Sequence, residues 1–301
     1  MKSLRLSILL PLVFIVYLAQ AGLNHDLAAQ QEGRDWPFEA KVDQFLLHSD
    51  FELNDPQRLE SILGGLRSDI SQALNLPEQK SSIHVVLFSN AKEYSRYMNH
   101  YFPSIEPRRA IYLQDRGPGM LFTFWHDDID MDLRHEAAHA VLNQSGVQLP
   151  LWLDEGVAEY FEVQRDKRFT QNAYGAEVAQ RAAKGLVPSL LDLERIAEMS
   201  EFKDTHYRDS WAWIHFLLHR RQETRQLLID YIARHRKLVP QANLSRQLAE
   251  IVVDPTVEFQ QHFSKVGNSQ PTSVSTIKGT LSTIKPVATQ TAAVPTSATQ
   301  K

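Results

Sequence analysis

Apolar residues in the first half of the chain follow two different spacings, which predict strands interleaved with helices. Runs rich in β-branched and aromatic residues predict four strands, at residues 42–53, 83–88, 110–113 and 120–125. Behind Pro56, apolar residues recur at helical spacing as far as Leu74, which predicts a helix with one buried face. A further helix is expected over residues 91–101.

The second half of the chain is predicted to be almost entirely helical. Residues 164–184 are the exception, because they are polar and poorly periodic and are expected to form a flexible excursion near the functional cleft. The fold class that follows is α+β, with a small mixed N-terminal sheet and its helices followed by a mainly helical C-terminal lobe. Helices of that lobe are expected around residues 132–140, from residue 154, from Pro188, and over residues 206–219, 223–236, 244–252 and 256–264.

The N-terminus has the pattern of a secretory signal peptide. Residues 1–21 begin with two basic residues, continue with an apolar run and end in Ala-Gln-Ala. The run is shorter than the roughly 20 residues that span a bilayer, which favours cleavage over retention as a membrane anchor. The sequence therefore predicts a secreted or periplasmic protein with no membrane span after cleavage, with residues 22–39 as a linker.

The C-terminus differs just as much from the middle of the chain. Residues 266–301 consist largely of Ser, Thr, Ala, Gln and Pro, with no acidic or aromatic residue. Such a stretch cannot bury enough apolar surface to offset the entropy lost on ordering, so a disordered tail is expected. Residues 40–265 remain as the folded domain.

Charge and cysteine content exclude several classes of function. The whole chain carries a net charge of −4; without the two basic residues of the signal peptide and the three lysines of the tail, the remainder carries −9. An acidic domain is a poor binder of polyanions, so nucleic acid is not an expected partner. The absence of cysteine excludes thiolate zinc ligands, thiol nucleophiles and disulfides.

The candidate chemistry lies in His135-Glu-Ala-Ala-His139, which has the spacing H-E-x-x-H. On a helix, residues four apart share a face, so His135 and His139 can present two imidazole nitrogens to one Zn²⁺ ion. Glu136 points in another direction and can act as the general base, because metal catalysis needs a carboxylate separate from the ligands. The alternative interpretation is a helix with two surface histidines.

A second acidic helix offers the third ligand that a catalytic zinc site requires. Glu155 lies 16 residues beyond His139, far enough for the first helix to end at Gly146 and for the chain to turn back. Asp154 is the expected N-cap of this helix. Glu159, one turn after Glu155, is expected to accept the other ring N–H of a ligand histidine. The alternative is a solvated acidic stripe, which the apolar residues on the other sides of the helix disfavour.

Together, His-Glu-x-x-His at residues 135–139 and Trp-Leu-x-Glu-Gly-x-Ala at residues 152–158 resemble the gluzincin metallopeptidases. With Asp-Leu-Arg-His-Glu and, at residues 207–213, Tyr-Arg-Asp-Ser-Trp-Ala-Trp, the chain is more closely similar to uncharacterised secreted bacterial proteins with a peptidase MA-like domain. This resemblance covers roughly residues 40–240. It implies a zincin-like fold, Zn²⁺ as the cofactor, and a peptide or protein substrate.

The resemblance also implies roles for individual residues. His135, His139 and Glu155 would be the zinc ligands, and Glu136 would be the general base. Glu159 would correspond to the acid that such enzymes carry one turn after the ligand glutamate.

Two further expectations concern the substrate. By the same resemblance, residues 120–125 would be the strand above the zinc that binds extended substrate by backbone pairing. A donor to the tetrahedral oxyanion is also needed, and Tyr207 is favoured over His206 because it belongs to the Tyr-x-x-Ser-Trp pattern; that Tyr207 only packs and caps a helix stays open. The chain lacks the Gly-x-Met-Glu-Asn motif of the aminopeptidases, which favours an endopeptidase over an aminopeptidase.

The sequence as a whole favours an exported zinc-dependent metallopeptidase that hydrolyses peptide bonds by metal-activated water, with Glu136 as the general base. The alternative is a non-catalytic binding or scaffold protein of the cell envelope that retains the zincin fold. A zinc hydrolase acting on a non-peptide bond is a third possibility, which no residue selects. The sequence leaves open the substrate, the position of cleavage, whether turnover is retained and the oligomeric state.

Overall fold

The computed structural model describes residues 36–114 and 119–268. The expected signal peptide, most of the expected linker and nearly all of the expected tail lie outside these residues. The described residues all belong to one compact unit. Within the described residues, every helix is too short or too polar to cross a membrane.

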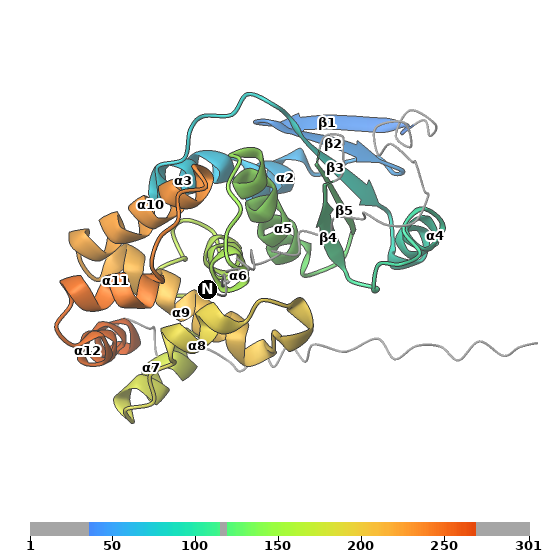
Figure 1. Ribbon diagram of the computed structural model, residues 1–301. Coiled ribbons are helices and arrows are strands. Elements are labelled where there is room, and N and C mark those ends of the chain that lie inside the picture. Colours follow the sequence, from blue (N-terminus) through green and yellow to red (C-terminus); the bar gives the residue numbers. More distant parts are fainter. Residues whose placement is uncertain (1–35, 115–118, 269–301) are drawn as a thin grey trace, which may run out of the picture. The chain divides into compact units, whose positions relative to one another are not determined.

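Five strands form one mixed sheet in the order β1-β2-β3-β5-β4 (Figure 1). The central strands β2, β3 and β5 run parallel, whereas β1 and β4 are antiparallel to their neighbours and form the two edges. The expected small mixed sheet is thereby confirmed. The strands are β1 (Phe38–Val42), β2 (Phe45–Ser49), β3 (Ile83–Phe88), β4 (Ala110–Leu113) and β5 (Met120–Phe124).

The strand expected to bind substrate is inside the sheet. β5 pairs with β3 on one side and with β4 on the other, so both of its edges are occupied. The expectation that residues 120–125 pair with an extended substrate is therefore wrong. β4 pairs with the outer side of β5 and forms this edge of the sheet.

The strand predicted over residues 42–53 is a hairpin instead. Val42 at the end of β1 pairs with Phe45 at the start of β2, which leaves a two-residue turn. Asp43 in this turn has a φ of 49°, the left-handed conformation that such turns require. Most of β1 is exposed, so it lacks the apolar alternation that marks a half-buried strand, and it begins inside the expected linker.

Helices cover both faces of the sheet (Figure 1). Side chains alternate along β3: Val85 and Leu87 belong to the larger core beneath α5, whereas Val86 and Phe88 belong to a smaller core beneath α4. The helices that pack on this sheet and on one another are α2 (Pro56–Leu63), α3 (Leu66–Leu74), α4 (Ala91–Tyr101) and α5 (Ile129–Gln144).

The single helix expected behind Pro56 is interrupted at Gly64–Gly65 and forms α2 and α3. Gly65 has a φ of 70°, which glycine adopts without the steric cost that other residues meet. The two helices nevertheless keep the predicted apolar face. Its residues, all buried, are Leu59, Ile62, Leu63, Leu66, Ile70 and Leu74.

The C-terminal lobe is helical, as predicted. Its central helix α6 is buried along most of its length and packs mainly against α9. The two helices approach each other tightly at Gly156, where an added Cβ would lie 2.9 Å from the carbonyl oxygen of Ser210. The elements of the lobe are α6 (Leu151–Phe161), α7 (Gly175–Ala183), α8 (Leu190–Arg195), the 3-10 helix η1 (Met199–Glu201), α9 (Asp204–His219), α10 (Gln222–Arg236), α11 (Leu244–Ile251) and α12 (Pro255–Asn268).

Candidate metal centre

The helix with the two histidines is followed by a reversal of the chain that places α6 alongside it. α5 ends at Gln144, and Gly146, with a φ of 69°, turns the chain where a helix stop was expected. The N-cap of α6 is Pro150 and not Asp154, which lies in the first turn of the helix. Because α5 and α6 pack against each other, their polar side chains can meet between them.

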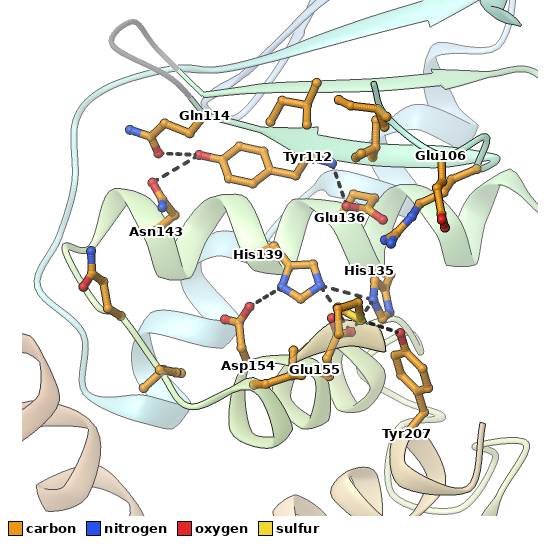
Figure 2. Close-up of a pocket in the computed structure, with 18 of the residues that line it drawn as sticks. Glu106, Tyr112, Gln114, His135, Glu136, His139, Asn143, Asp154, Glu155 and Tyr207 are labelled. Carbon is orange, nitrogen blue, oxygen red and sulfur yellow. Dashed lines mark hydrogen bonds and ion pairs between the residues drawn. The ribbon is translucent and has the colours of Figure 1, made fainter. Parts of the chain in front are cut away.

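His135, His139 and Glu155 converge on one point between the two helices (Figure 2). The Nε2 atoms of the two histidines lie 3.2 Å apart, and Glu155 Oε2 lies 3.4 Å from the first and 3.6 Å from the second. Ligands at zinc–nitrogen and zinc–oxygen bond lengths with tetrahedral angles lie about 3.4 Å from one another. The three atoms therefore have the mutual spacing of a zinc site with three protein ligands.

Each of these histidines has a carboxylate on its other ring nitrogen. His135 Nδ1 lies 3.2 Å from Glu162 Oε2, and His139 Nδ1 lies 2.9 Å from Asp154 Oδ2. When Nδ1 carries the proton toward a carboxylate, Nε2 is left with a free lone pair toward Glu155. The hydrogen bond with Glu162 thus selects for His135 the tautomer that a metal requires, and Asp154 places a negative charge beside Nδ1 of His139.

The contact expected of Glu159 is made by Glu162. Glu159 is buried and faces Glu162, and burial together with the charge of Glu162 raises its pKa to about 8. The hydrogen bond from the His135 ring, expected to reach Glu159, is accepted instead by Glu162, which lies one turn further along the chain and just after α6. A carboxylate oxygen of Glu159 nevertheless lies within 4.8 Å of a ring nitrogen of His135 and of a Glu162 oxygen.

The carboxylates make this cluster attractive to positive charge. Burial lowers the pKa of His139, but Asp154 and Glu155 outweigh burial and raise it to about 10. The pKa of His135 is likewise held well above its ordinary value, by Glu155 and Glu162 against the effect of burial. The same field that retains protons on these rings favours a divalent cation in their place.

Glu136 lies on the other side of α5, toward the sheet. Its Oε2 accepts a hydrogen bond of 2.8 Å from the backbone N–H of Tyr112 in the edge strand β4. One oxygen of Glu136 is thereby fixed, while a carboxylate retains further lone pairs on the other. The carboxylate lines the same cleft as the two histidines (Figure 2).

The structure separates the two residues considered as oxyanion donors. Tyr207 lines the cleft and its hydroxyl lies 3.6 Å from the sulfur of Met199 (Figure 2). Burial and the charge of Glu155 raise the pKa of Tyr207, so that the hydroxyl keeps its proton. His206 instead accepts a hydrogen bond from Lys203 N–H at the start of α9 and does not line the cleft.

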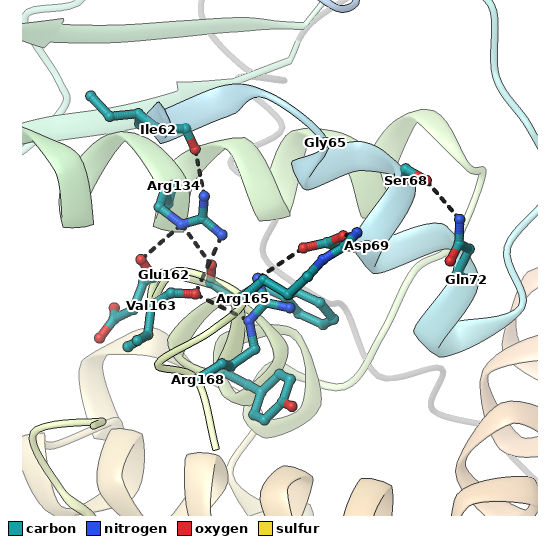
Figure 3. Close-up of polar contacts among 12 residues, drawn as sticks. Ile62, Gly65, Ser68, Asp69, Gln72, Arg134, Glu162, Val163, Arg165 and Arg168 are labelled. Carbon is teal, nitrogen blue, oxygen red and sulfur yellow. Dashed lines mark hydrogen bonds and ion pairs between the residues drawn. The ribbon is translucent and has the colours of Figure 1, made fainter. Parts of the chain in front are cut away.

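Arg134, the residue before His135, fixes α5 to the end of α6 (Figure 3). Its buried guanidinium donates from Nε to the carbonyl oxygens of Phe161 and Glu162, and from Nη1 to that of Ile62. These carbonyls end helices and have no partner within them, so the arginine satisfies groups that burial would otherwise leave unpaired. The position of Glu162 beside His135 depends on this junction.

Sequence reasoning missed Arg134, Glu162 and the contact of Asp154 with His139. A signal existed for the first two. An arginine inside a helix that must be buried has to find carbonyl partners, and Glu162 follows Glu159 by three residues, which is helical spacing. The pairing of Glu136 with Tyr112 had no sequence signal.

The site opens into a cleft with a volume of about 510 Å³ (Figure 2). Its walls come from segment 104–108, β4, α5, the loop before α6, the first turns of α6, and η1 with Tyr207. No residue of the segment 164–184 lines it, because α7 packs instead against α12 and α9. The expectation of an excursion near the cleft is therefore wrong.

A family model described as "Protein of unknown function (DUF1570)" matches residues 131–240. The matched range runs from α5 into the loop after α10 and includes the three converging residues. No curated protein matches the chain. The comparisons thus point to an uncharacterised family and assign no activity.

Proposed function

We propose that the chain is an exported zinc-dependent metallopeptidase of the zincin type, which hydrolyses peptide bonds with Glu136 as the general base. The observation that carries this proposal is the mutual spacing of 3.2–3.6 Å among His135 Nε2, His139 Nε2 and Glu155 Oε2. The resemblance of the two motifs to gluzincins supports it from the sequence side. Export rests on the expected signal peptide.

The residues fit zinc in number and in chemistry. Two imidazoles and one carboxylate are a donor set of catalytic zinc sites, which keep a further position open. The three side chains face a cleft and not a closed core. When bound, Zn²⁺ would polarise a substrate carbonyl and lower the pKa of a water molecule.

The protein's own groups supply the proton transfers and the oxyanion donor. In the proposed mechanism, Glu136 accepts the proton of the attacking water and passes it to the leaving amine. Tyr112 N–H holds one oxygen of Glu136 in place, so the other oxygen is the one that accepts and donates the proton. Tyr207, protonated because its pKa is raised, donates to the oxyanion as the carbonyl becomes tetrahedral.

The edge strand β4 is the proposed binding strand for an extended peptide. In an antiparallel ladder, alternate residues turn their backbone groups away from the neighbouring strand. Tyr112 N–H points to Glu136 and away from β5, so by this alternation Ala110 has the same orientation. A peptide can add to this edge as a further strand, with its scissile bond over α5.

The deciding experiment compares wild-type protein with Glu136→Gln. Zinc per chain is measured by atomic emission, and hydrolysis is measured on a mixed peptide library. Glu136→Gln is expected to keep one zinc per chain and to lose turnover, whereas His139→Ala loses both. Equal hydrolysis by wild type and Glu136→Gln would end the proposed mechanism.

A non-catalytic binding protein of the cell envelope is the second candidate function. The hydrogen bond between Glu136 and Tyr112 favours it, because it engages both the proposed base and a backbone group of the strand edge. Full zinc occupancy together with a peptide library that stays uncut would select this alternative.

A further inference from the structure

Among the described residues that line the cleft, Arg108 is the single arginine or lysine. This arginine lies in the segment before β4, on the same wall of the cleft as this edge strand. Its position two residues before Ala110 places it where a peptide paired with β4 would pass. Its guanidinium is exposed to solvent and so can be reached by a ligand.

Arg108 differs from its neighbour in how its charge is used. Arg109 is engaged by two carboxylates, with Asp128 and Asp132 each 2.9 Å from its guanidinium. In the described part of the chain, Arg108 has no ion pair and no side-chain hydrogen bond. Of the two consecutive arginines, Arg109 thus faces structural carboxylates, whereas Arg108 lines the cleft.

The acidic residues nearest the metal centre are committed to other partners. Glu155 faces both histidines, Asp154 contacts His139, and Glu136 is held by Tyr112. Arg108 is therefore a cation beside a cleft whose innermost carboxylates are already engaged.

The positive charge of Arg108 interacts with a residue beside the metal centre. It acts on the Tyr207 hydroxyl, where it partly offsets the burial and the Glu155 charge that raise the pKa of this group. The same charge acts on Tyr94, which the charge of Glu136 also reaches. Arg108 thus lines the cleft together with Glu136 and Tyr207.

We infer that Arg108 is a specificity-determining residue that binds a carboxylate of the peptide substrate, so that the substrate class is acidic or carboxylate-terminated peptides. A planar guanidinium can hold a carboxylate through two parallel hydrogen bonds, and an unpaired one has its donors available for this. The carboxylate can come from an Asp or Glu side chain of the peptide or from its C-terminus. This inference rests on the proposed function for the identity of the ligand as a peptide.

Binding is measured in a form that does not turn substrate over. Zinc-loaded Glu136→Gln protein is titrated into one fluorescent peptide prepared in four versions, which combine a C-terminal acid or amide with a central Glu or Gln. Replacing the carboxylate that Arg108 recognises is expected to weaken binding by roughly 10- to 100-fold, the range of charge-assisted hydrogen bonds. If the C-terminal amide weakens binding, the recognised carboxylate is the C-terminus. If the central Gln weakens binding, it is the side chain.

The double variant Glu136→Gln/Arg108→Gln is expected to bind all four versions with equal affinity. Arg108→Lys keeps the charge without the planar fork and is expected to restore only part of the preference. Arg96→Gln is the matched control, because Arg96 pairs with Glu93 on α4 and does not line the cleft, and it should leave the preference intact. The inference is overturned if the preference for a carboxylate survives Arg108→Gln. It is also overturned if the Glu136→Gln protein shows no such preference.

The inference and the proposed function can fail separately. Wild-type protein is incubated with the same four peptides and cleavage is followed by mass spectrometry. Cleavage with no dependence on either carboxylate rejects the role of Arg108 and leaves the peptidase. Arg108-dependent binding without cleavage rejects the peptidase and leaves a carboxylate-binding site.

Discussion

The Glu136 carboxylate and the Tyr112 backbone N–H are joined by a hydrogen bond of 2.8 Å. This bond connects the helix that carries the two histidines to the edge strand β4. Tyr112 also reaches α5 through its side chain, because its hydroxyl lies 3.3 Å from Asn143 Oδ1. Two hydrogen bonds thus fix the distance between α5 and β4, which both line the cleft.

Glu162→Gln is expected to weaken zinc binding by roughly 10- to 100-fold, because Glu162 holds the Nδ1 proton of His135 and a neutral amide does so less well. Competition with a fluorescent chelator measures the affinity. Glu159→Gln is the matched control and should change it by far less, since Glu162 and not Glu159 accepts the hydrogen bond from His135 Nδ1. A larger loss in Glu159→Gln would show that the two acids have been assigned the wrong way round.

Tyr207→Phe is expected to lower kcat by roughly 10²- to 10³-fold while zinc content and KM stay the same, because the hydroxyl acts on the oxyanion and not on the ground state. Steady-state kinetics on a cleaved library peptide measure both constants. His206→Ala removes the acceptor for Lys203 N–H and should cost about 1 kcal/mol of stability with kcat preserved. A normal kcat in Tyr207→Phe would contradict the assignment.

Gly156→Ala is expected to destabilise the fold by about 1–3 kcal/mol, because the new Cβ would lie 2.9 Å from the Ser210 carbonyl oxygen and force α6 away from α9. Since Glu155 is the preceding residue, zinc affinity should fall as well. Gly146→Ala has open space around the new Cβ but a φ of 69°, so it should lower stability by about 1–2 kcal/mol without changing metal affinity. Urea denaturation and chelator competition test the pair.

Acid is expected to destabilise the zinc-free protein through His262. Burial, followed by the charges of His219, Arg220 and Lys265, lowers its pKa from 6.5 to about 3. The unfolded chain therefore binds a proton between pH 6.5 and pH 3 that the folded chain does not. The contribution of neutral His262 to the free energy of unfolding is fully present above pH 6.5. It falls with decreasing pH by up to about 1.4 kcal/mol per pH unit.

His262→Gln tests this pH dependence. His262 Nε2 and His215 Nδ1 lie 2.8 Å apart, and a glutamine amide can still donate to His215 while it cannot take up a proton. Urea denaturation of the two proteins between pH 7 and pH 4.5, in the presence of a chelator, should give a shallower loss of stability for the variant. Equal slopes would show that His262 is protonated in the folded state at these pH values.

Several elements could be predicted from the sequence with their bounds. β3 and β4 have the predicted limits, and α4 occupies the predicted residues 91–101 with the Asn90 side chain accepting from two N–H groups at its start. In these segments the apolar period and the end signals are local and agree with each other. β1 could not be predicted, since an exposed edge strand has little apolar pattern.

The sequence by itself determined which side chains could form a metal site: H-E-x-x-H fixes two histidines on one face of a helix, because residues four apart on a helix are neighbours whatever surrounds them. It also determined an α+β chain with a helical second half. Only the tertiary structure decided that Glu162 and not Glu159 contacts His135, that β4 and not β5 forms the edge of the sheet, and that Arg108 turns to the cleft. These relations depend on how the helices pack and how the strands are ordered, and contacts between segments far apart in the chain leave no local period to read.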